Sequence, residues 1–220
     1  MTALGRRGFS MLTGAWALAG CSGSLLPKAP AAAAQYTLDD GGVPAGVSSS
    51  PLPGAPVLLV APPSAAAGFD TARMVYLQSP QRLDSFAYHA WVEPPARMLA
   101  PPLLRALQAT GAFRAVLLAP TAAVGDYRLE VELVRLQQDF TLQPSQVRLT
   151  LRVVLVQVKT RRAVAAQTFD EAVAATGDDP VAGAAAAQRA ARRVLAAVAA
   201  ACKGWALAAQ AASAAPSRPA

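Results

Sequence analysis

The alternation of apolar and polar residues is clearest in the second half of the chain. From residue 127 to 133 every second residue is apolar, and the residues between them are arginine or glutamate. The same two-residue period runs from residue 147 to 155. A strand with one buried and one solvated face has this period. Together with Ala163 to Phe169, which follows a turn at residues 159–162, these segments predict three long antiparallel strands.

The second of these strands changes its pattern beyond Val153, because Val154, Val156 and Val158 are apolar as well. Either a β-bulge shifts the phase there, or both faces of that end are covered. Shorter apolar runs predict further strands in the first half of the chain. They lie at residues 36–38, 57–60, 74–77, 85–89 and 113–118.

A helical period of three to four residues follows the prolines at positions 94 and 95. Large apolar residues recur at this spacing between Met98 and Leu107, and proline is tolerated in the first turn of a helix. The segment therefore predicts a helix that is capped at its C-terminus by Gly111. Pro101 and Pro102 fall inside this helix and are expected to kink or split it.

A second, alanine-rich helix is predicted near the C-terminus. Asp179 is a typical N-cap and Pro180 a typical first helical residue. The helix is expected to run to Lys203, with Gly204 as its stop. Together the elements predict an α+β fold, in which a mainly antiparallel sheet packs against two helices in a single domain.

The first 21 residues have the pattern of an export signal. Arg6 and Arg7 precede an apolar run from Phe9 to Ala19, which is shorter than the roughly 20 residues of a transmembrane helix. The stretch Leu18-Ala19-Gly20-Cys21, at the end of this run, resembles a lipobox, which implies that Cys21 is the lipidated N-terminus of the mature protein. An ordinary secretory signal with a chance cysteine is the alternative. The general and the twin-arginine export routes both stay open.

This interpretation divides the chain into four parts. They are a signal peptide (1–20), a flexible tether (21–35), the α+β domain (36–205) and a disordered tail (206–220). Each buried CH₂ of an acyl chain contributes about 0.8 kcal/mol, so two or three chains on Cys21 hold a protein firmly to a bilayer. The domain is then extracytoplasmic and attached to a membrane through its lipid anchor.

The chain of 220 residues is basic, with a formal net charge of +7, although charged residues make up only 15% of it. Most basic residues are scattered, apart from Arg161-Arg162 and a group around Arg192. A nucleic-acid site would be a dense basic stripe interleaved with aromatic residues. We therefore expect no nucleic-acid partner, and a solvated surface with some attraction to anionic headgroups. Cys202 has no disulfide partner if Cys21 is acylated, and it is expected to act as a small buried hydrophobe.

No set of residues forms a recognisable active site. His89 is the only histidine, which excludes zinc sites built on several histidines and leaves it as the one candidate base of a Ser-His-Asp triad; an ordinary surface or core position explains it better. No P-loop or Cys-x-x-Cys spacing occurs. Glu130 and Glu132 lie beside arginines and fit a solvated strand face. We expect a protein that is not an enzyme and holds no cofactor or metal.

A short span in the first half is rich in residue types that are common at binding hot spots. It contains Arg73, Tyr76, Tyr88 and Trp91. These four residues are candidates for a partner-binding surface. The alternative is that the tyrosines and the tryptophan are core residues of a chain with only 6% aromatic residues.

Several of these positions together resemble one known family. They are the lipobox, Tyr36 and Leu38, the run from Met74 to Leu77, the segment from Tyr88 to Trp91, and the leucine helix after Pro95. They are similar to those of the ABC-type transport auxiliary lipoprotein family, over roughly residues 36 to 203. The family includes the lipoprotein of the paraquat-inducible intermembrane transport system, and its members accompany transporters that carry a mammalian-cell-entry (MCE) subunit.

The resemblance implies a non-enzymatic subunit that works with an ATPase, a permease and an MCE protein. It would help them move phospholipid or other hydrophobic molecules between the inner and outer membranes. Ser22 stands where an aspartate would signal inner-membrane retention, which favours the periplasmic face of the outer membrane. A homo-oligomer stays open. The alternative is an outer-membrane lipoprotein that activates or assembles another envelope complex, such as a cell-wall synthase.

Overall fold

The structure is a computed structural model that describes residues 32–38 and 54–214, with side chains as far as residue 211. Cys21 and the predicted signal peptide lie outside the described residues. In chain order the elements are β1 (Ala34–Tyr36), β2 (Val57–Val60), β3 (Ser64–Ala65), β4 (Arg73–Ser79), β5 (Arg82–Trp91), α1 (Pro95–Ala109), β6 (Ala115–Leu118), β7 (Tyr127–Asp139), β8 (Gln146–Gln157), β9 (Arg162–Ala174) and α2 (Pro180–Ala214).

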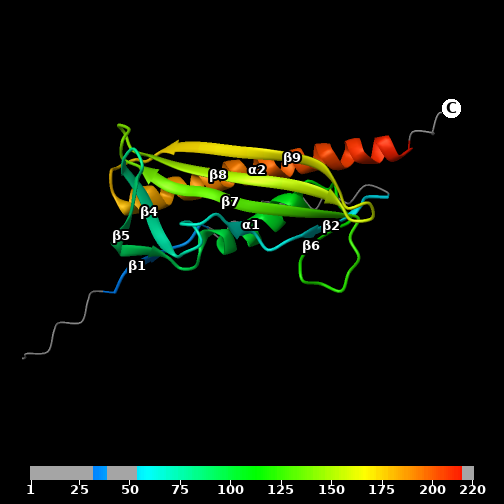
Figure 1. Cartoon of the computed structure of the whole chain (residues 1–220), viewed down its shortest axis with the longest axis horizontal. Coiled ribbons are helices and arrows are strands. Elements are labelled where there is room, and N and C mark those ends of the chain that lie inside the picture. The colour runs from blue at the N-terminus through cyan, green and yellow to red at the C-terminus, as the bar shows by residue number, and fades with distance from the viewer. Residues whose placement is uncertain (1–31, 39–53, 215–220) are drawn as a thin grey trace, which may run out of the picture. The chain divides into compact units, whose positions relative to one another are not determined.

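Strand β7 is the centre of the sheet (Figure 1). One of its edges pairs antiparallel with β8 along the whole strand, and β8 pairs antiparallel with β9. Its other edge pairs in turn with β2, β3 and β4, all of them parallel to it. The three long antiparallel strands predicted from the two-residue period are confirmed. They form the wide part of the sheet because their alternating leucines and valines bury one continuous face.

The short strands extend the sheet at the two ends of β7. At its carboxyl end, β4 and β5 form an antiparallel hairpin, and β1 adds to β5 in parallel. At its amino end, β6 adds in parallel to β2. The α+β class and the two packed helices are confirmed. The long pairings of the sheet are antiparallel as predicted, and the short strands add parallel pairs, so the sheet is mixed. The two-residue period cannot reveal the direction of strands this short, because direction depends on the connections between them.

The valines at the end of β8 lie on the solvent side of an unbroken strand. Val153 and Leu155 are fully buried, while Val154 and Val156 are half-buried on the opposite face. The register shift lies between Leu155 and Val156, where β9 contributes the extra residue. The bulge is therefore on the partner strand, and β8 keeps its phase.

Both helices pack on the same face of the sheet and against each other (Figure 1). Helix α1 is a single helix from Pro95 to Ala109, so the predicted split at Pro101 and Pro102 is wrong. Its residues Leu99, Leu103 and Leu107 are fully buried against the rest of the domain. This packing stabilises the helix although the two prolines lack backbone N–H groups. Gly111 follows the helix with φ +64°, which confirms its predicted place at the C-terminus.

Helix α2 begins as predicted, because Asp179 Oδ1 accepts hydrogen bonds from the backbone N–H groups of Val181 (2.8 Å) and Ala182 (2.9 Å). Its predicted end at Lys203 is wrong, since the helix continues through Gly204 to Ala214. Tertiary packing explains the continuation: Ala206 is buried, and the ring of Trp205 lies 6.4 Å from that of Phe169 on β9.

By length and composition α2 is the one described helix that could cross a membrane. Its packing explains the same composition, because a line of alanines with Val194, Val198 and Cys202 is buried against the sheet and α1. Core helices of soluble domains share this length and hydropathy. Helix α2 packs as a core helix of the domain.

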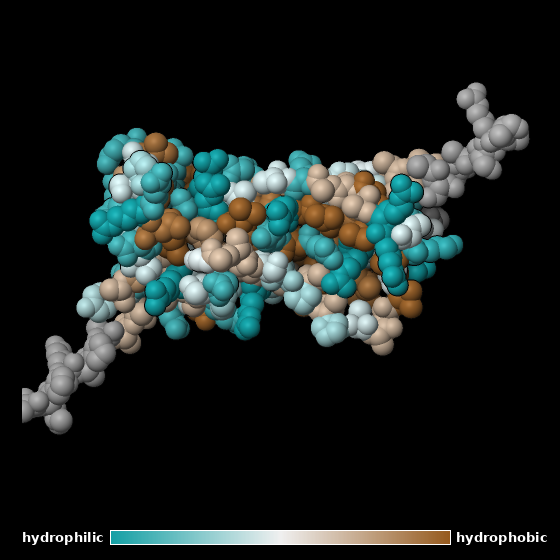
Figure 2. Space-filling view, viewed as in Figure 1, coloured by the Kyte–Doolittle hydropathy of each residue, from teal (hydrophilic) through white to brown (hydrophobic). Residues whose placement is uncertain are grey.

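The other face of the sheet carries no helix in the described part of the chain. Figure 2 shows this face, with apolar residues between charged ones. Half-buried Val154 and Val156 belong to it, as do exposed Arg128, Arg148 and Arg152. This mixture is that of a solvated sheet face.

Candidate functional site

Five ring-bearing side chains meet where β1, β4 and β5 leave the carboxyl end of β7. We call Tyr36, Tyr76, Phe86, His89 and Phe140 the aromatic cluster; all five are half-buried. Ring centroids lie 4.5 Å apart for Tyr76 and Phe86, and 5.7 Å apart for Tyr76 and Phe140. Phe86 continues the contacts to His89 at 6.1 Å, and His89 stacks on Tyr36 at 5.8 Å. Such pairs contribute about 0.5–1.5 kcal/mol each beyond the burial of their area.

The aromatic cluster fixes β1 to the rest of the domain. Tyr36 Oη lies 2.9 Å from His89 Nδ1, and the carbonyl of Tyr36 accepts a hydrogen bond from the N–H of Val92. Gln188 on α2 donates to the carbonyl of Thr37. Strand β1 is therefore held by β5 on one side and by α2 at its end.

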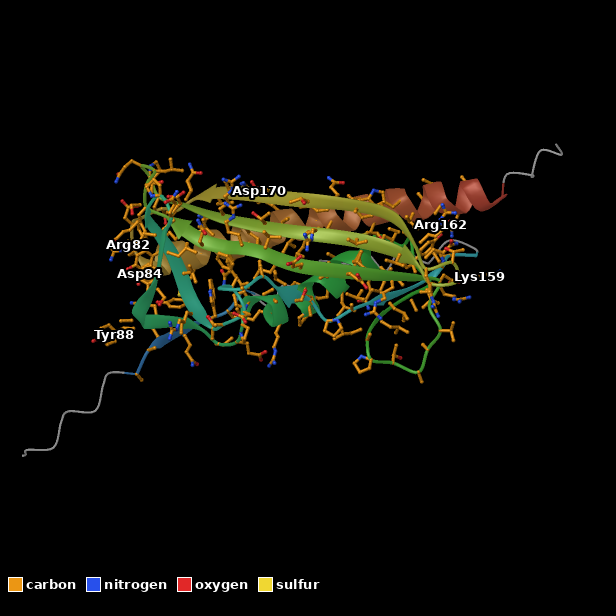
Figure 3. The ribbon with its side chains drawn as sticks, in the orientation of Figure 1. Arg82, Asp84, Tyr88, Lys159, Arg162 and Asp170 are labelled. Carbon is orange, nitrogen blue, oxygen red and sulfur yellow. The ribbon has the colours of Figure 1, made fainter. Side chains whose placement is uncertain are left out.

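The structure separates the four residues predicted to bind a partner. Trp91 is 4% exposed and belongs to the core, so it cannot present its ring to a partner in this conformation. Tyr76 is held in the aromatic cluster between Phe86 and Phe140. Tyr88 is 61% exposed and points away from the sheet (Figure 3), and Arg73 is exposed at the start of β4. The predicted surface is thereby reduced to Arg73 and Tyr88 beside a partly exposed aromatic cluster.

Trp91 lines a small crevice between the sheet and the first turns of α2. Met74, Phe86, Leu136, Gln138 and Gly183 are among its other lining residues. The space inside is about 10 Å³, enough for about one water molecule. The crevice is therefore too small for a lipid or another substrate.

Gln138 is the one polar side chain in this region that stays partly unpaired in the described structure. Its Nε2 donates to Ser145 Oγ at 3.0 Å, while its buried Oε1 has no hydrogen-bond partner. Helix α2 approaches this oxygen closely, because a Cβ on Gly183 would overlap it. The glycine explains how a helix can pass directly over a buried amide.

The described residues offer no arrangement for catalysis or metal binding. His89 has Tyr36 as its hydrogen-bond partner and no carboxylate within reach, so a triad is not formed. No group of three or more potential metal ligands occurs among the described histidine, cysteine, aspartate and glutamate residues. Glu130 pairs with Arg128 at 3.1 Å, and Glu132 pairs with Arg152. Both glutamates therefore belong to the solvated sheet face, as predicted.

A third pair on this face links β8 to β9. Arg148 donates to both carboxylate oxygens of Asp170, at 2.6 Å from Nη2 and at 3.0 and 3.1 Å from Nε. These hydrogen bonds, with one from Thr150, hold the pKa of the Asp170 carboxyl below its ordinary value. Arg128, Arg148 and Arg152 thus each have a carboxylate partner, which reduces the positive charge of this face.

Cys202 is a buried free thiol in α2, as predicted. Burial raises the pKa of this thiol from 9.0 to about 12. Since the thiolate is the reactive form, the residue is chemically inert near neutral pH. It serves as part of the helix–sheet packing.

Residues 36–199 match the profile of the ABC-type transport auxiliary lipoprotein component family. The chain belongs to that family. Protein XCC0632 from Xanthomonas campestris has 26% identity and a TM-score of 0.67, and the match covers 81% of this chain and 99% of that one. An uncharacterised protein of known structure has 14% identity and a TM-score of 0.60, over 78% of this chain and 99% of that one, and it shows the fold alone. No curated protein matches.

The sequence pattern indicates Tyr76 as a candidate binding residue but does not connect it with the other four residues of the aromatic cluster. Phe86 and His89 stand three apart in one strand, which normally places them on opposite faces. An irregular stretch of β5 brings them together: Arg73 pairs with Ala90, and Val75 with Ser85. No sequence pattern announces that irregularity.

Proposed function

We propose that this protein is a lipid-anchored, non-enzymatic auxiliary subunit of an MCE-type ABC transporter that moves phospholipid or other hydrophobic molecules between the inner and outer membranes. The observation that carries the proposal is the family match over most of the domain. The lipobox pattern at Cys21 supports a lipid anchor, and Ser22 in place of a retention aspartate favours the periplasmic face of the outer membrane. The ATPase and permease are expected as further subunits.

The protein would act by docking on the MCE protein. Arg73 and Tyr88 are exposed beside the aromatic cluster, and arginine and tyrosine are common binding anchors. Strand β1, which follows the predicted tether, is fixed at this same end of the domain. A tether raises the effective concentration of a module near its partner without any new contact.

The experiment measures binding between the chain from residue 21 and the soluble part of its MCE partner. Arg73→Ala and Tyr88→Ala should each weaken binding by about 2 kcal/mol, or roughly thirtyfold, if they are anchors. Arg162→Ala removes a comparable exposed charge at the opposite end of the sheet and serves as the matched control. Melting temperatures should stay unchanged in all three variants, because the three side chains are exposed.

Binding that survives both changes would remove this surface from the proposal. Failure of the wild-type chain to bind any MCE protein, or to copurify with an ABC transporter, would overturn the proposed function itself. Mass spectrometry of the mature N-terminus tests the anchor separately. An unmodified Cys21, or a mature N-terminus elsewhere, would contradict lipidation.

A further inference from the structure

Basic side chains gather at the end of the sheet opposite the aromatic cluster. We call Arg114, Lys159, Arg161 and Arg162 the basic end; all four are exposed. Arg114 precedes β6, Lys159 and Arg161 lie in the turn between β8 and β9, and Arg162 is the first residue of β9. Figure 3 shows Lys159 and Arg162 at this end, far from Arg82, Asp84 and Tyr88.

The strand pairing places Arg114 and the three basic residues near the β8–β9 turn at the same end of the sheet. The N–H of Arg114 donates to the carbonyl of Pro56, one residue before β2. Beside it, the backbone N–H of Asp126 donates to the carbonyl of Val57. The backbone carbonyl of Asp126 accepts from the N–H of Val158, one residue before Lys159. These backbone bonds run across β6, β2, β7 and β8 at the amino end of β7. The aromatic cluster lies at the carboxyl end, and a strand of 13 residues spans about 40 Å.

The basic end differs from the sheet face in its electrostatics. Arg128, Arg148 and Arg152 on the face each pair with a carboxylate. The four residues of the basic end form no ion pair with any residue that the structure describes. Asp126 is the nearby acid on these strand ends, and its Oδ2 accepts the N–H of Val57 at 2.7 Å. Its single negative charge leaves the four basic residues with a net positive charge at this end.

Exposed aliphatic side chains surround these charges. Val124, in the loop between β6 and β7, is 87% exposed, and Val158 and Val164, which flank the basic turn, are each 37% exposed. The loop with Val124 reaches the turn through the bond between Asp126 and Val158. Arginine and lysine without ion-pair partners, beside exposed aliphatic side chains, are typical of surfaces that bind anionic lipid. The charges meet phosphate groups, and the aliphatic groups enter the headgroup boundary.

We propose that the basic end binds the phosphate headgroups of an anionic membrane surface, separately from any lipid anchor. A nucleic acid is disfavoured because the basic end contains no aromatic side chain for stacking. An acidic protein would use the charges but gives no role to three exposed valines. The membrane contact leaves the aromatic cluster, at the other end of β7, free for a protein partner. The inference does not depend on the proposed transporter.

The test uses the chain from residue 21 with Cys21→Ala, which keeps every described residue and removes the acylation site. Cosedimentation is measured with vesicles of phosphatidylethanolamine and phosphatidylglycerol, and with vesicles of phosphatidylcholine alone. Each basic side chain at a membrane surface raises affinity roughly fivefold, so Lys159→Gln with Arg162→Gln should weaken binding to the anionic vesicles roughly 25-fold. Val124→Ser should weaken it roughly threefold.

The matched control is Arg82→Gln with Arg97→Gln, which removes the same net charge from exposed positions on β5 and α1. This pair should retain most of the binding, and circular dichroism should show that all variants are folded. Added salt should reduce binding of the wild-type chain. Equal binding to neutral and anionic vesicles, or an equal loss in the control pair, would overturn the proposal. The proposal would also be overturned if the wild-type chain bound no vesicles and the basic end bound an acidic protein instead.

Discussion

The two ends of the sheet use their distinctive residues in opposite ways. At the carboxyl end of β7, aromatic side chains pack against one another, and Trp91 is buried in the core. At the amino end, the basic residues are exposed at or next to the ends of β6, β8 and β9. One end is therefore rich in stabilising contacts, and the other in unsatisfied charge.

This difference shows why composition alone misleads about binding surfaces. Aromatic residues attract attention in a chain that has few of them, yet their large apolar area makes burial their commonest fate. Lysine and arginine in a short turn attract less attention, because exposed charge is ordinary. What distinguishes the basic end is that it forms no ion pairs with the part of the chain that the structure describes, which only the three-dimensional arrangement reveals.

The largest expected contrast separates Trp91 from Tyr88 at the aromatic end. Trp91→Ala should reduce the free energy of unfolding by about 3–5 kcal/mol, because it leaves a cavity in the core. Tyr88→Ala, at a side chain that is 61% exposed, should change it by less than about 0.5 kcal/mol. Urea unfolding of both variants measures the difference. Similar losses in the two would mean that Tyr88 packs against the domain and is no free surface residue.

The long strands and the start of α2 could be predicted because their causes are local. Alternation of leucine or valine with charged residues determines which face is buried, and the carboxylate of Asp179 caps the helix it precedes. The end of α2 could not be predicted from Gly204, because the packing of Trp205 on Phe169 joins residues far apart in the sequence. For the same reason the sequence could not distinguish the exposed candidates from the buried one: Tyr88 and Arg73 are exposed, and Trp91 is buried by partners on other elements.

The next contrast concerns the glycine of α2 nearest the aromatic end. Gly183→Ala places a methyl group against Gln138 Oε1, whose amide is buried and bonded to Ser145. Overpacking costs about 1–3 kcal/mol, and the better helix propensity of alanine offsets about 1 kcal/mol of it. A net loss of about 1 kcal/mol is expected in urea unfolding.

Gln138→Ala in the same chain tests the cause of that loss. The double variant should be more stable than the sum of the two single losses predicts, because the oxygen that the new methyl group meets is gone. Strict additivity would show that the destabilisation has another origin.

Alkaline pH should expose the burial of Cys202 in the same helix. Its folded pKa is about 12, against 9.0 for the free thiol, so above pH 9 the unfolded chain loses a proton that the folded chain retains. Stability should therefore fall as the pH rises from 9 to 12, by up to about 1.4 kcal/mol per pH unit. Burial, with the charge of Asp126, also raises the pKa of Tyr127. Cys202→Ala should flatten the alkaline slope without abolishing it, and an unchanged slope would mean that the thiol is accessible to solvent.

The smallest expected effect is at the glycine of α2 that lies beyond its buried middle. A Cβ on Gly204 would meet no atom within 4 Å, and the residue is exposed within the helix. Gly204→Ala should therefore raise the free energy of unfolding by about 0.5–1 kcal/mol, because alanine loses less backbone freedom than glycine in a helix. Its sign is opposite to that expected at Gly183, although both changes add one methyl group to the same helix. If Gly204→Ala leaves stability unchanged, the last turns of α2 contribute nothing to cooperative folding, and the contact between Trp205 and Phe169 does not hold them in solution.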